Sequence, residues 1–304
     1  MRARAELALA AVTILWGSTF VMVKAALADV SPILFIGLRF SLAAVTLALI
    51  YGRKVRRNAL GGGLLAGSLL FAAFVCQTMG LALTTPSKSA FLTSLSIPMV
   101  PLAGSLVYRS RPKLAEVAGI LVSSVGMILL TLPANPLGAG GFGVALRLTT
   151  GDWLSFFCAV LFAVHIVVTG HYSPIGGFES LAVIQAAVAA VLGLSIFRFA
   201  EPVRFHLTLG VGAAVVVTGL LTTALAFTTM AWAQQYTSAT RAALIFTVEP
   251  VVAWLTSWIL TGEALANRGK VGAGLILAGI VLGELTRTQP HPARAETIGG
   301  RRTS

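Results

Sequence analysis

Arg39 and Glu249 are ionisable residues that stand inside long apolar stretches of the sequence. A charge at the centre of a bilayer costs about 2.5 to 3.5 kcal/mol even on insertion scales, so such a residue needs a partner or a water-filled cavity. Glu249 lies near the middle of the apolar segment 238–260, and Pro250 after it predicts a kink because proline donates no backbone hydrogen bond. Glu249 is therefore either a proton or cation site or a hydrogen-bonded residue at a kink.

Arg39 lies about two helical turns into segment 32–51, too deep to reach water without a cavity. It could neutralise an anionic group of a solute or pair with a fixed carboxylate such as Glu249. His165 stands midway along another apolar segment, where it could relay protons or form a hydrogen bond within the core.

The other candidates for a solute or ion pathway are amides, aromatics and basic residues. Each could line a cavity, pack helices together, or reach the membrane interface with a long side chain. These candidates are Trp16, Lys24, Gln77, Lys88, Gln185, Trp232, Gln234 and Arg241.

The sequence lacks patterns typical of an enzyme or a nucleotide site. Residues 138–143 match G-x-G-x-x-G but link two apolar segments with no strand before them, so the dinucleotide interpretation fails. Glycines at 262–270 have the wrong spacing for a phosphate loop, and the ten acidic residues are scattered rather than clustered for metal or acid–base chemistry. We expect no cofactor, no metal and no enzymatic activity; a membrane-embedded lipid-modifying enzyme remains an alternative.

The composition identifies the environment of the chain. Charged residues form 11% of the 304 residues and the mean hydropathy is +0.90, whereas soluble proteins contain about 25% charged residues. A soluble protein could not cover its surface with so few charges, so we predict an integral membrane protein. The net charge of +12 comes from bases in loops and at both ends, which is typical of membrane topology. Membrane lipids, and not nucleic acid, are the expected partners.

Apolar stretches of crossing length predict an all-α protein with ten transmembrane helices. Helices are preferred to barrel strands because the apolar runs are long and continuous, whereas barrel strands would alternate polar and apolar residues over about ten positions. The predicted helices cover residues 6–27, 32–51, 60–83, 86–108, 114–132, 152–172, 178–199, 207–234, 238–260 and 268–286.

Basic residues predict the orientation in the membrane. An N-terminus inside the cell places more Lys and Arg in cytoplasmic loops than outside, including the cluster Arg53, Lys54, Arg56 and Arg57. We therefore expect both termini in the cytoplasm and the protein in the plasma (inner) membrane of a bacterium.

The two halves of the chain resemble each other weakly. Sliding one over the other places Arg39 on Gln185, Gly119 on Gly272 and Gly126 on Gly279. The predicted division is a first five-helix repeat at 1–133, a glycine-rich linker at 134–151, a second repeat at 152–286 and a disordered basic tail at 287–304. Five helices per repeat would orient the halves oppositely, as in inverted-repeat transporters.

Several short motifs together resemble the EamA-type members of the drug/metabolite transporter superfamily. They are Trp16-Gly-Ser-Thr-Phe-Val-Met-Val-Lys24, Leu38-Arg-Phe40, Lys88-Ser-Ala-Phe-Leu-Thr-Ser-Leu, Gly151-Asp152, Glu249-Pro250 and Gly262-Glu263. The resemblance implies a ten-helix carrier with two inverted repeats and a central cavity. Family members mostly export amino acids, other metabolites or toxic compounds, often against a proton gradient. The Gly-Glu-Arg usual after the fourth helix reads Tyr108-Arg109-Ser110 here.

We therefore expect a secondary transporter that exports small molecules by alternating access. Trp16, Arg39, Gln77, Gln185 and Glu249 are the main pathway candidates, with Glu249 as the proton carrier if transport is proton-coupled. A channel or a non-transporting membrane protein is the alternative. The sequence selects no particular solute, and it leaves open whether the protein forms a homodimer.

Overall fold

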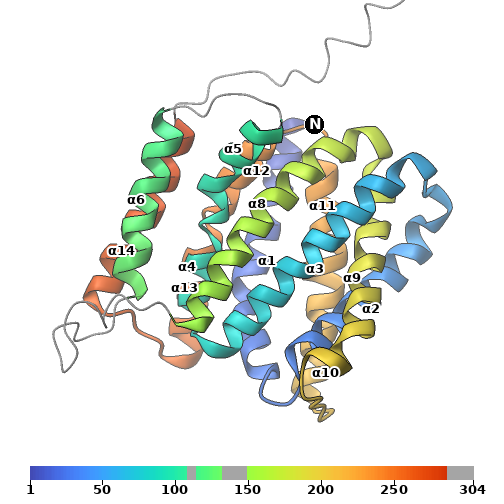
Figure 1. The fold of residues 1–304 in the computed structure, drawn as a ribbon, viewed down its shortest axis with the longest axis horizontal. Helices are drawn as coiled ribbons and strands as arrows, with labels where there is room; N and C mark the ends of the chain where they lie inside the picture. Colours follow the sequence, from blue (N-terminus) through green and yellow to red (C-terminus); the bar gives the residue numbers. More distant parts are fainter. Residues whose placement is uncertain (108–113, 132–148, 286–304) are drawn as a thin grey trace, which may run out of the picture.

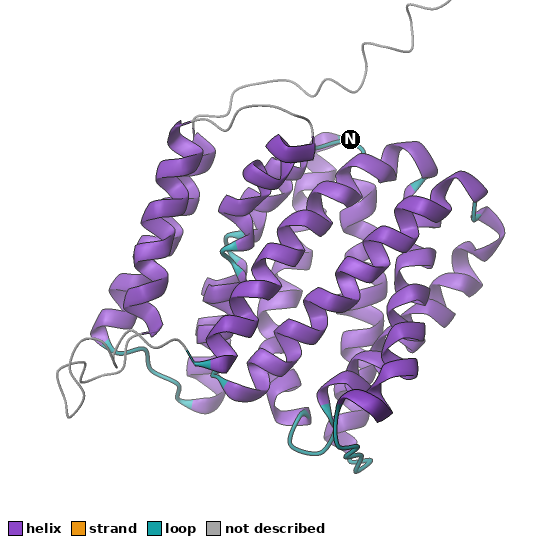
Figure 2. Ribbon diagram, in the orientation of Figure 1, coloured by secondary structure: helices purple, strands orange, loops and turns teal. Residues whose placement is uncertain are grey.

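The computed structural model describes residues 1–107, 114–131 and 149–285, and every regular element within these ranges is helical (Figures 1 and 2). The predicted all-α class is confirmed. Residues 134–148 of the linker predicted at 134–151, and the tail predicted at 287–304, lie outside the described residues. The α-helices are α1 (Arg2–Ala26), α2 (Pro32–Tyr51), α3 (Leu60–Leu83), α4 (Pro86–Thr93), α5 (Ser96–Val107), α6 (Leu114–Thr131), α8 (Thr150–Gly176), α9 (Phe178–Ala200), α10 (Leu209–Val217), α11 (Ala226–Ala233), α12 (Ala239–Phe246), α13 (Glu249–Thr261) and α14 (Asn267–Leu285).

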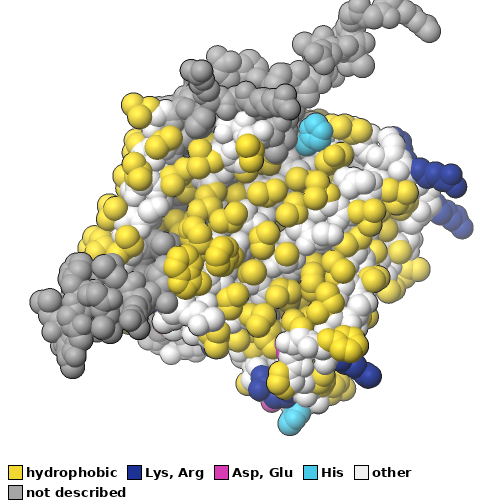
Figure 3. Space-filling view, in the orientation of Figure 1, with side chains coloured by type: hydrophobic (Ala, Val, Ile, Leu, Met, Phe, Trp, Pro, Cys, Tyr) yellow, Lys and Arg dark blue, Asp and Glu magenta, His cyan; other side chains and the backbone are white. Residues whose placement is uncertain are grey.

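The outer surface suits a lipid environment. Within the described residues, seven helical stretches are long and apolar enough to cross a membrane. Hydrophobic side chains cover the face seen in Figure 3, and the Lys and Arg side chains visible there lie near its edges. Leu49 on α2 and Leu106 on α5, for example, are 83% and 82% exposed. In water such a surface would aggregate, so the chain is an integral membrane protein.

Two of the predicted helices are broken near their middles. Segment 86–108 forms α4 and α5 with a break at Ser94 and Leu95, and segment 238–260 forms α12 and α13 with a break before Glu249. The prediction of continuous helices was wrong at these two places, although the kink predicted at Pro250 is confirmed. Pro98 and Pro250 both stand in the first turn of the second helix, where a missing backbone donor costs nothing.

Segment 207–234 also departs from a regular α-helix. Between α10 and α11 the chain forms a π-helix, η3 (Thr218–Leu225). A π-helix is wider than an α-helix and occurs frequently at functional sites. Here it places Thr222 and Thr223 toward the interior, where both are buried.

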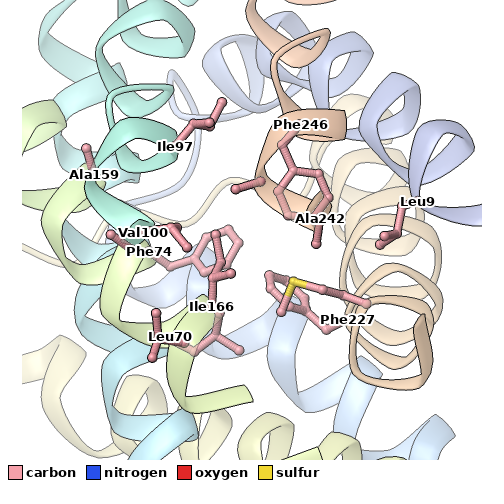
Figure 4. Packing of buried hydrophobic residues seen from close by; sticks show 14 of the residues in the cluster. Leu9, Leu70, Phe74, Ile97, Val100, Ala159, Ile166, Phe227, Ala242 and Phe246 are labelled. Carbon is pink, nitrogen blue, oxygen red and sulfur yellow. The ribbon is translucent and has the colours of Figure 1, made fainter. Parts of the chain in front are cut away.

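The helices pack as a bundle with a pair of helices at one side (Figure 1). Helix α2 packs against α9, and α3 packs against both α8 and α9. Helix α1 packs against α13, and α8 packs against α5. The main hydrophobic core lies between these elements and includes Phe74, Ile97 and Phe227 (Figure 4).

The side pair, α6 and α14, meets through glycines. A Cβ atom added to Gly126 would lie 2.6 Å from the carbonyl oxygen of Gly272, and one added to Gly279 would meet the carbonyl oxygen of Gly119. The two backbones are therefore in direct contact. In a bilayer such close contact supplies the dispersion energy that holds helices together, because lipid tails are as apolar as leucine.

We expect Gly272→Ala to lower the melting temperature of the detergent-solubilised protein. The new methyl group would overlap the Gly126 carbonyl, and overpacking typically costs about 1 to 3 kcal/mol. Gly274→Ala on the same helix is the matched control, because a Cβ atom there meets nothing within 4 Å. Intrinsic tryptophan fluorescence during heating measures both variants. Equal melting temperatures would contradict the role of the glycine contact.

Candidate functional site

A cavity lies inside the bundle, where the breaks of α4–α5 and α12–α13 face α1, α2, α3, α8 and η3. Its volume is about 80 Å³, which is more than a single water molecule needs. Five of the residues predicted from sequence line it together: Trp16, Arg39, Gln77, His165 and Glu249. Aromatic rings form much of the remaining wall, and Figure 4 shows Phe74, Phe227 and Phe246 converging in this region.

Arg39 on α2 is buried against the cavity and is held by the π-helix. Its guanidinium donates to Thr223 Oγ1 from Nε at 3.0 Å and from Nη2 at 2.8 Å, and Nη2 also donates to Thr222 Oγ1 at 3.1 Å. The Phe74 ring lies beneath it, 4.5 Å from the guanidinium carbon to the ring centroid. Among the described residues no carboxylate forms an ion pair with Arg39, so the pairing with Glu249 considered above is not made. The side chain presents a positive charge to the cavity without a fixed counter-ion.

Glu249 is the first residue of α13 and lines the same cavity. Its side chain is half-buried and forms neither a hydrogen bond nor an ion pair with any residue in the described ranges. The backbone beside it is fixed by α1, because a Cβ atom at Gly17 would lie 2.6 Å from the Glu249 carbonyl oxygen. A carboxyl group is thus held at a helix break, where its oxygens are free to bind a proton, a cation or an ammonium group.

Trp16 on α1 joins the cavity wall to the π-helix. Its indole Nε1 donates to the carbonyl oxygen of Thr222 at 2.9 Å. The ring packs between Phe227 and Phe246, with centroid distances of 5.3 and 5.2 Å. Gln77 on α3 is half-buried and contributes a polar amide to the same wall.

His165 on α8 forms a hydrogen bond beneath the cavity. Its Nε2 lies 3.0 Å from Gln185 Oε1 on α9 and 3.4 Å from Thr169 Oγ1. The other ring nitrogen, Nδ1, is buried and has no hydrogen-bond partner among the described residues. The imidazole is therefore held through Nε2, while Nδ1 lacks a hydrogen-bond partner among the described residues.

Three of the predicted pathway residues lie outside the cavity and make packing contacts. Gln185 binds His165 from behind the wall. Gln234 Nε2 donates to the Ile166 carbonyl at 3.1 Å and so joins the end of α11 to α8. Trp232 packs its ring against Tyr236 at a centroid distance of 5.5 Å.

Lys24 likewise lies outside the cavity, at the end of another helix. Its Nζ donates to the carbonyl oxygens of Leu81 and Ala82 at 2.9 and 2.8 Å. These carbonyls belong to the last turn of α3, where a helix has no backbone donors of its own and where a positive charge is favourable. Lys24 thus connects α1 to the end of α3.

Lys88 and Arg241 stand at the starts of α4 and α12 and form ion pairs. Lys88 Nζ lies 2.8 Å from Asp152 Oδ1 on α8, and Arg241 Nη1 lies 3.4 Å from Glu6 Oε1 on α1. Neither Lys88 nor Arg241 lines the cavity. Arg241 is the more exposed of the two, so its long side chain is the better placed to reach the membrane interface.

Sequence reasoning missed the threonines that hold Arg39. Thr222 and Thr223 are adjacent hydroxyl residues in an apolar segment, and this was the available signal. Their role depends on η3, because the π-helix sets which of its side chains face α2. Thr93 and Ser94, at the break of α4, also line the cavity and were not predicted.

Comparison with known sequences identifies relatives over nearly the whole chain. The EamA-like transporter family matches residues 3–132 and 149–283. An Archaeoglobus fulgidus protein named as an uncharacterized transporter is 31% identical over 282 residues, covering 92% of this chain and 86% of its own. A Salmonella typhimurium protein named as a probable amino-acid metabolite efflux pump is 27% identical over 288 residues. This alignment covers 89% of this chain and 91% of the Salmonella protein.

A solved structure has the same fold. Described only as a crystal structure of a protein, it superposes with a TM-score of 0.67 at 21% sequence identity. The superposition covers 94% of this chain and 98% of the other. At this identity the likeness supports the helical arrangement alone.

We expect Lys24→Leu to destabilise the protein because the last carbonyls of α3 lose a charged donor. Hydrogen bonds to charged groups contribute about 1.5 to 3 kcal/mol each, so the melting temperature in detergent should fall by several degrees. Lys24→Gln keeps a donor without the charge and should lie between the leucine variant and the wild type. A leucine variant as stable as the wild type would show that this contact contributes nothing.

Proposed function

The chain belongs to the EamA-like transporter family, and from this we propose that it is a secondary active transporter that exports small solutes from the cytoplasm by alternating access. The observation that carries the proposal is the cavity within the bundle, where Arg39 and Glu249 bring opposite charges that are not paired with each other. Fixed charges without partners are expensive in a membrane, and binding a solute would compensate them.

We further propose ten membrane spans arranged as two inverted repeats, 1–133 and 152–286. Three pairs of features support a pseudo-twofold relation. The fourth and ninth predicted spans are both broken, and the packing of α1 on α13 corresponds to that of α8 on α5. The contacts Gly126–Gly272 and Gly279–Gly119 exchange into each other under the repeat alignment. The excess of basic residues in the loops on one side supports both termini in the cytoplasm.

The cavity favours a zwitterionic solute with an apolar body. The Arg39 guanidinium would bind a carboxylate by donating hydrogen bonds to it, and the Glu249 carboxylate would bind an ammonium group by accepting hydrogen bonds from it. Phe74, Phe227 and Phe246 would contact an apolar side chain. Amino acids combine these three groups, and the Salmonella relative is named for amino-acid metabolite efflux.

Proton coupling would follow from competition at Glu249. A carboxyl group that has no fixed partner can hold either a proton or a solute ammonium group, but not both at once. Arg39 and His165 are the other titratable groups lining the same cavity, and neither bonds to Glu249. A proton entering from outside would displace the solute outward, and its release to the cytoplasm would restore the binding form.

We expect Glu249→Gln to abolish pH-gradient-driven export while keeping solute exchange. The amide retains the shape of the side chain but cannot take up a proton, so proteoliposomes should lose accumulation driven by an imposed pH gradient. Counterflow at equal pH should persist, with a weaker apparent affinity because the amide offers the solute ammonium group no charge. Glu179→Gln, at the surface pair with Lys54, is the matched control. Unchanged coupled flux would remove Glu249 from the mechanism, and a wild type without saturable counterflow would favour a channel.

We expect phenylalanine to raise the melting temperature of the wild type more than phenethylamine or 3-phenylpropanoate does, because only the zwitterion meets both charges. Ligand binding stabilises the folded state according to its affinity. Arg39→Gln should weaken phenylalanine binding at least about ten-fold, whereas the phenethylamine effect should change little. Arg39→Lys, with the charge but without the planar fork, should be intermediate. Equal stabilisation by all three compounds would contradict the zwitterion proposal.

A further inference from the structure

We infer that two ion pairs, Lys88–Asp152 and Arg241–Glu6, are latches that close the cavity at opposite ends of the bundle. Transport would release one latch while the other holds. That the latches open during transport rests on the proposed function. That they join the two halves of the chain rests on contacts in the structure.

The two basic residues occupy matched positions. Lys88 is the third residue of α4, and its backbone N–H lies 3.4 Å from the Oγ1 of the cap residue Thr85. Arg241 is the third residue of α12, and its backbone N–H lies 3.2 Å from Ser238 Oγ. Both helices are eight residues long and end at a break. The same local structure thus presents a cation at the start of each short helix.

Each acidic partner lies in the other half of the chain. Lys88 reaches Asp152 in the first turn of α8, and Arg241 reaches Glu6 near the start of α1. Each pair therefore joins the two halves rather than two helices of one half. An ion pair in this place resists separation of the halves at its own end.

The two pairs lie at opposite ends of the bundle. Helix α8 has 27 residues and is about 40 Å long, and Asp152 stands at its start. Near its other end, the carbonyl of Ser173 accepts a hydrogen bond from Gln235, which lies between α11 and α12. The start of α12, with Arg241, is therefore a membrane thickness away from the Lys88 pair.

Each short helix connects its latch to the cavity. Helix α4 carries Lys88 at its start, and Thr93 at its end lines the cavity. Helix α12 carries Arg241 at its start, and Phe246 at its end lines the cavity. Each helix is about 12 Å long, so a latch that opens allows a rigid half-helix to move at the cavity wall.

The two latches differ in strength. The Lys88–Asp152 pair is short, and its side chains are only 20% and 1% exposed. The Arg241–Glu6 pair is longer and its side chains are 54% and 34% exposed, with Arg2 sharing the same carboxylate. Exposed pairs contribute little to stability, whereas removing one partner of a buried pair is strongly destabilising. The end that carries Lys88 is therefore the more firmly closed.

The test measures access to the cavity from each side of the membrane. The background carries Cys76→Ala and Cys158→Ala, and Thr19→Cys in the cavity wall reports labelling by a membrane-impermeant maleimide in vesicles of each orientation. Lys88→Gln and Asp152→Asn should each raise labelling from the face where α8 begins, on the order of five-fold. The double variant should match either single one. Arg241→Gln should raise labelling from the opposite face, about two-fold.

Lys54→Gln is the matched control, because Lys54–Glu179 also joins the two halves but involves neither α4 nor α12. Latch variants that label like this control from both faces, or equally from both faces, would overturn the inference. So would an effect of Asp152→Asn without one of Lys88→Gln, since Asp152 also caps α8 with Thr149. Labelling needs no solute. Side-selective opening in a protein that fails the flux assays would uphold the latches and remove the proposed function.

Discussion

The hydrogen bonds from the Arg39 guanidinium to Thr222 and Thr223 are the interaction on which the site depends. A buried cation is usually stabilised by a carboxylate, which neutralises it. Here two neutral hydroxyl groups and the face of Phe74 hold the guanidinium and leave its charge in place. Because Arg39 forms no ion pair with Glu249, the Glu249 carboxyl group is also unpaired among the described residues. The threonines of the π-helix thus leave a guanidinium and a carboxyl group in one cavity, and neither is paired with the other.

The broken helices follow the same physical constraint. Backbone groups without partners cannot face lipid, and irregular backbone at membrane depth is tolerated where it lines a cavity. The breaks at Ser94–Leu95 and before Glu249 lie beside the cavity. They also divide each span into two short rigid pieces, so a movement at the membrane surface can reach the site without unfolding a helix.

Charged side chains near the surface hold helix ends that belong to other elements. Lys24 binds the last carbonyls of α3, Arg204 donates to the Leu27 carbonyl at the end of α1 at 2.7 Å, and the Glu201 carboxylate accepts the backbone N–H groups of Ile33 and Leu34 at the start of α2. Each contact places a charge at the helix end whose dipole favours it. Lys24, a pathway candidate by sequence, makes one of these contacts.

The sequence is sufficient to predict the helical class, the membrane location, most helix bounds, and the position of Arg39 and Glu249 within apolar segments. Those features follow from local hydropathy, because the cost of a charge or an open backbone in lipid depends on each segment alone. The packing of the helices was needed to show that Arg39 bonds to threonines rather than to Glu249, that five distant residues share one cavity, and that Lys88 and Arg241 pair across the halves. Those contacts join residues far apart in the chain, and the π-helix that orients Thr222 has no signature in periodicity. Which charges meet is set by how the helices pack, and hydropathy carries no record of that packing.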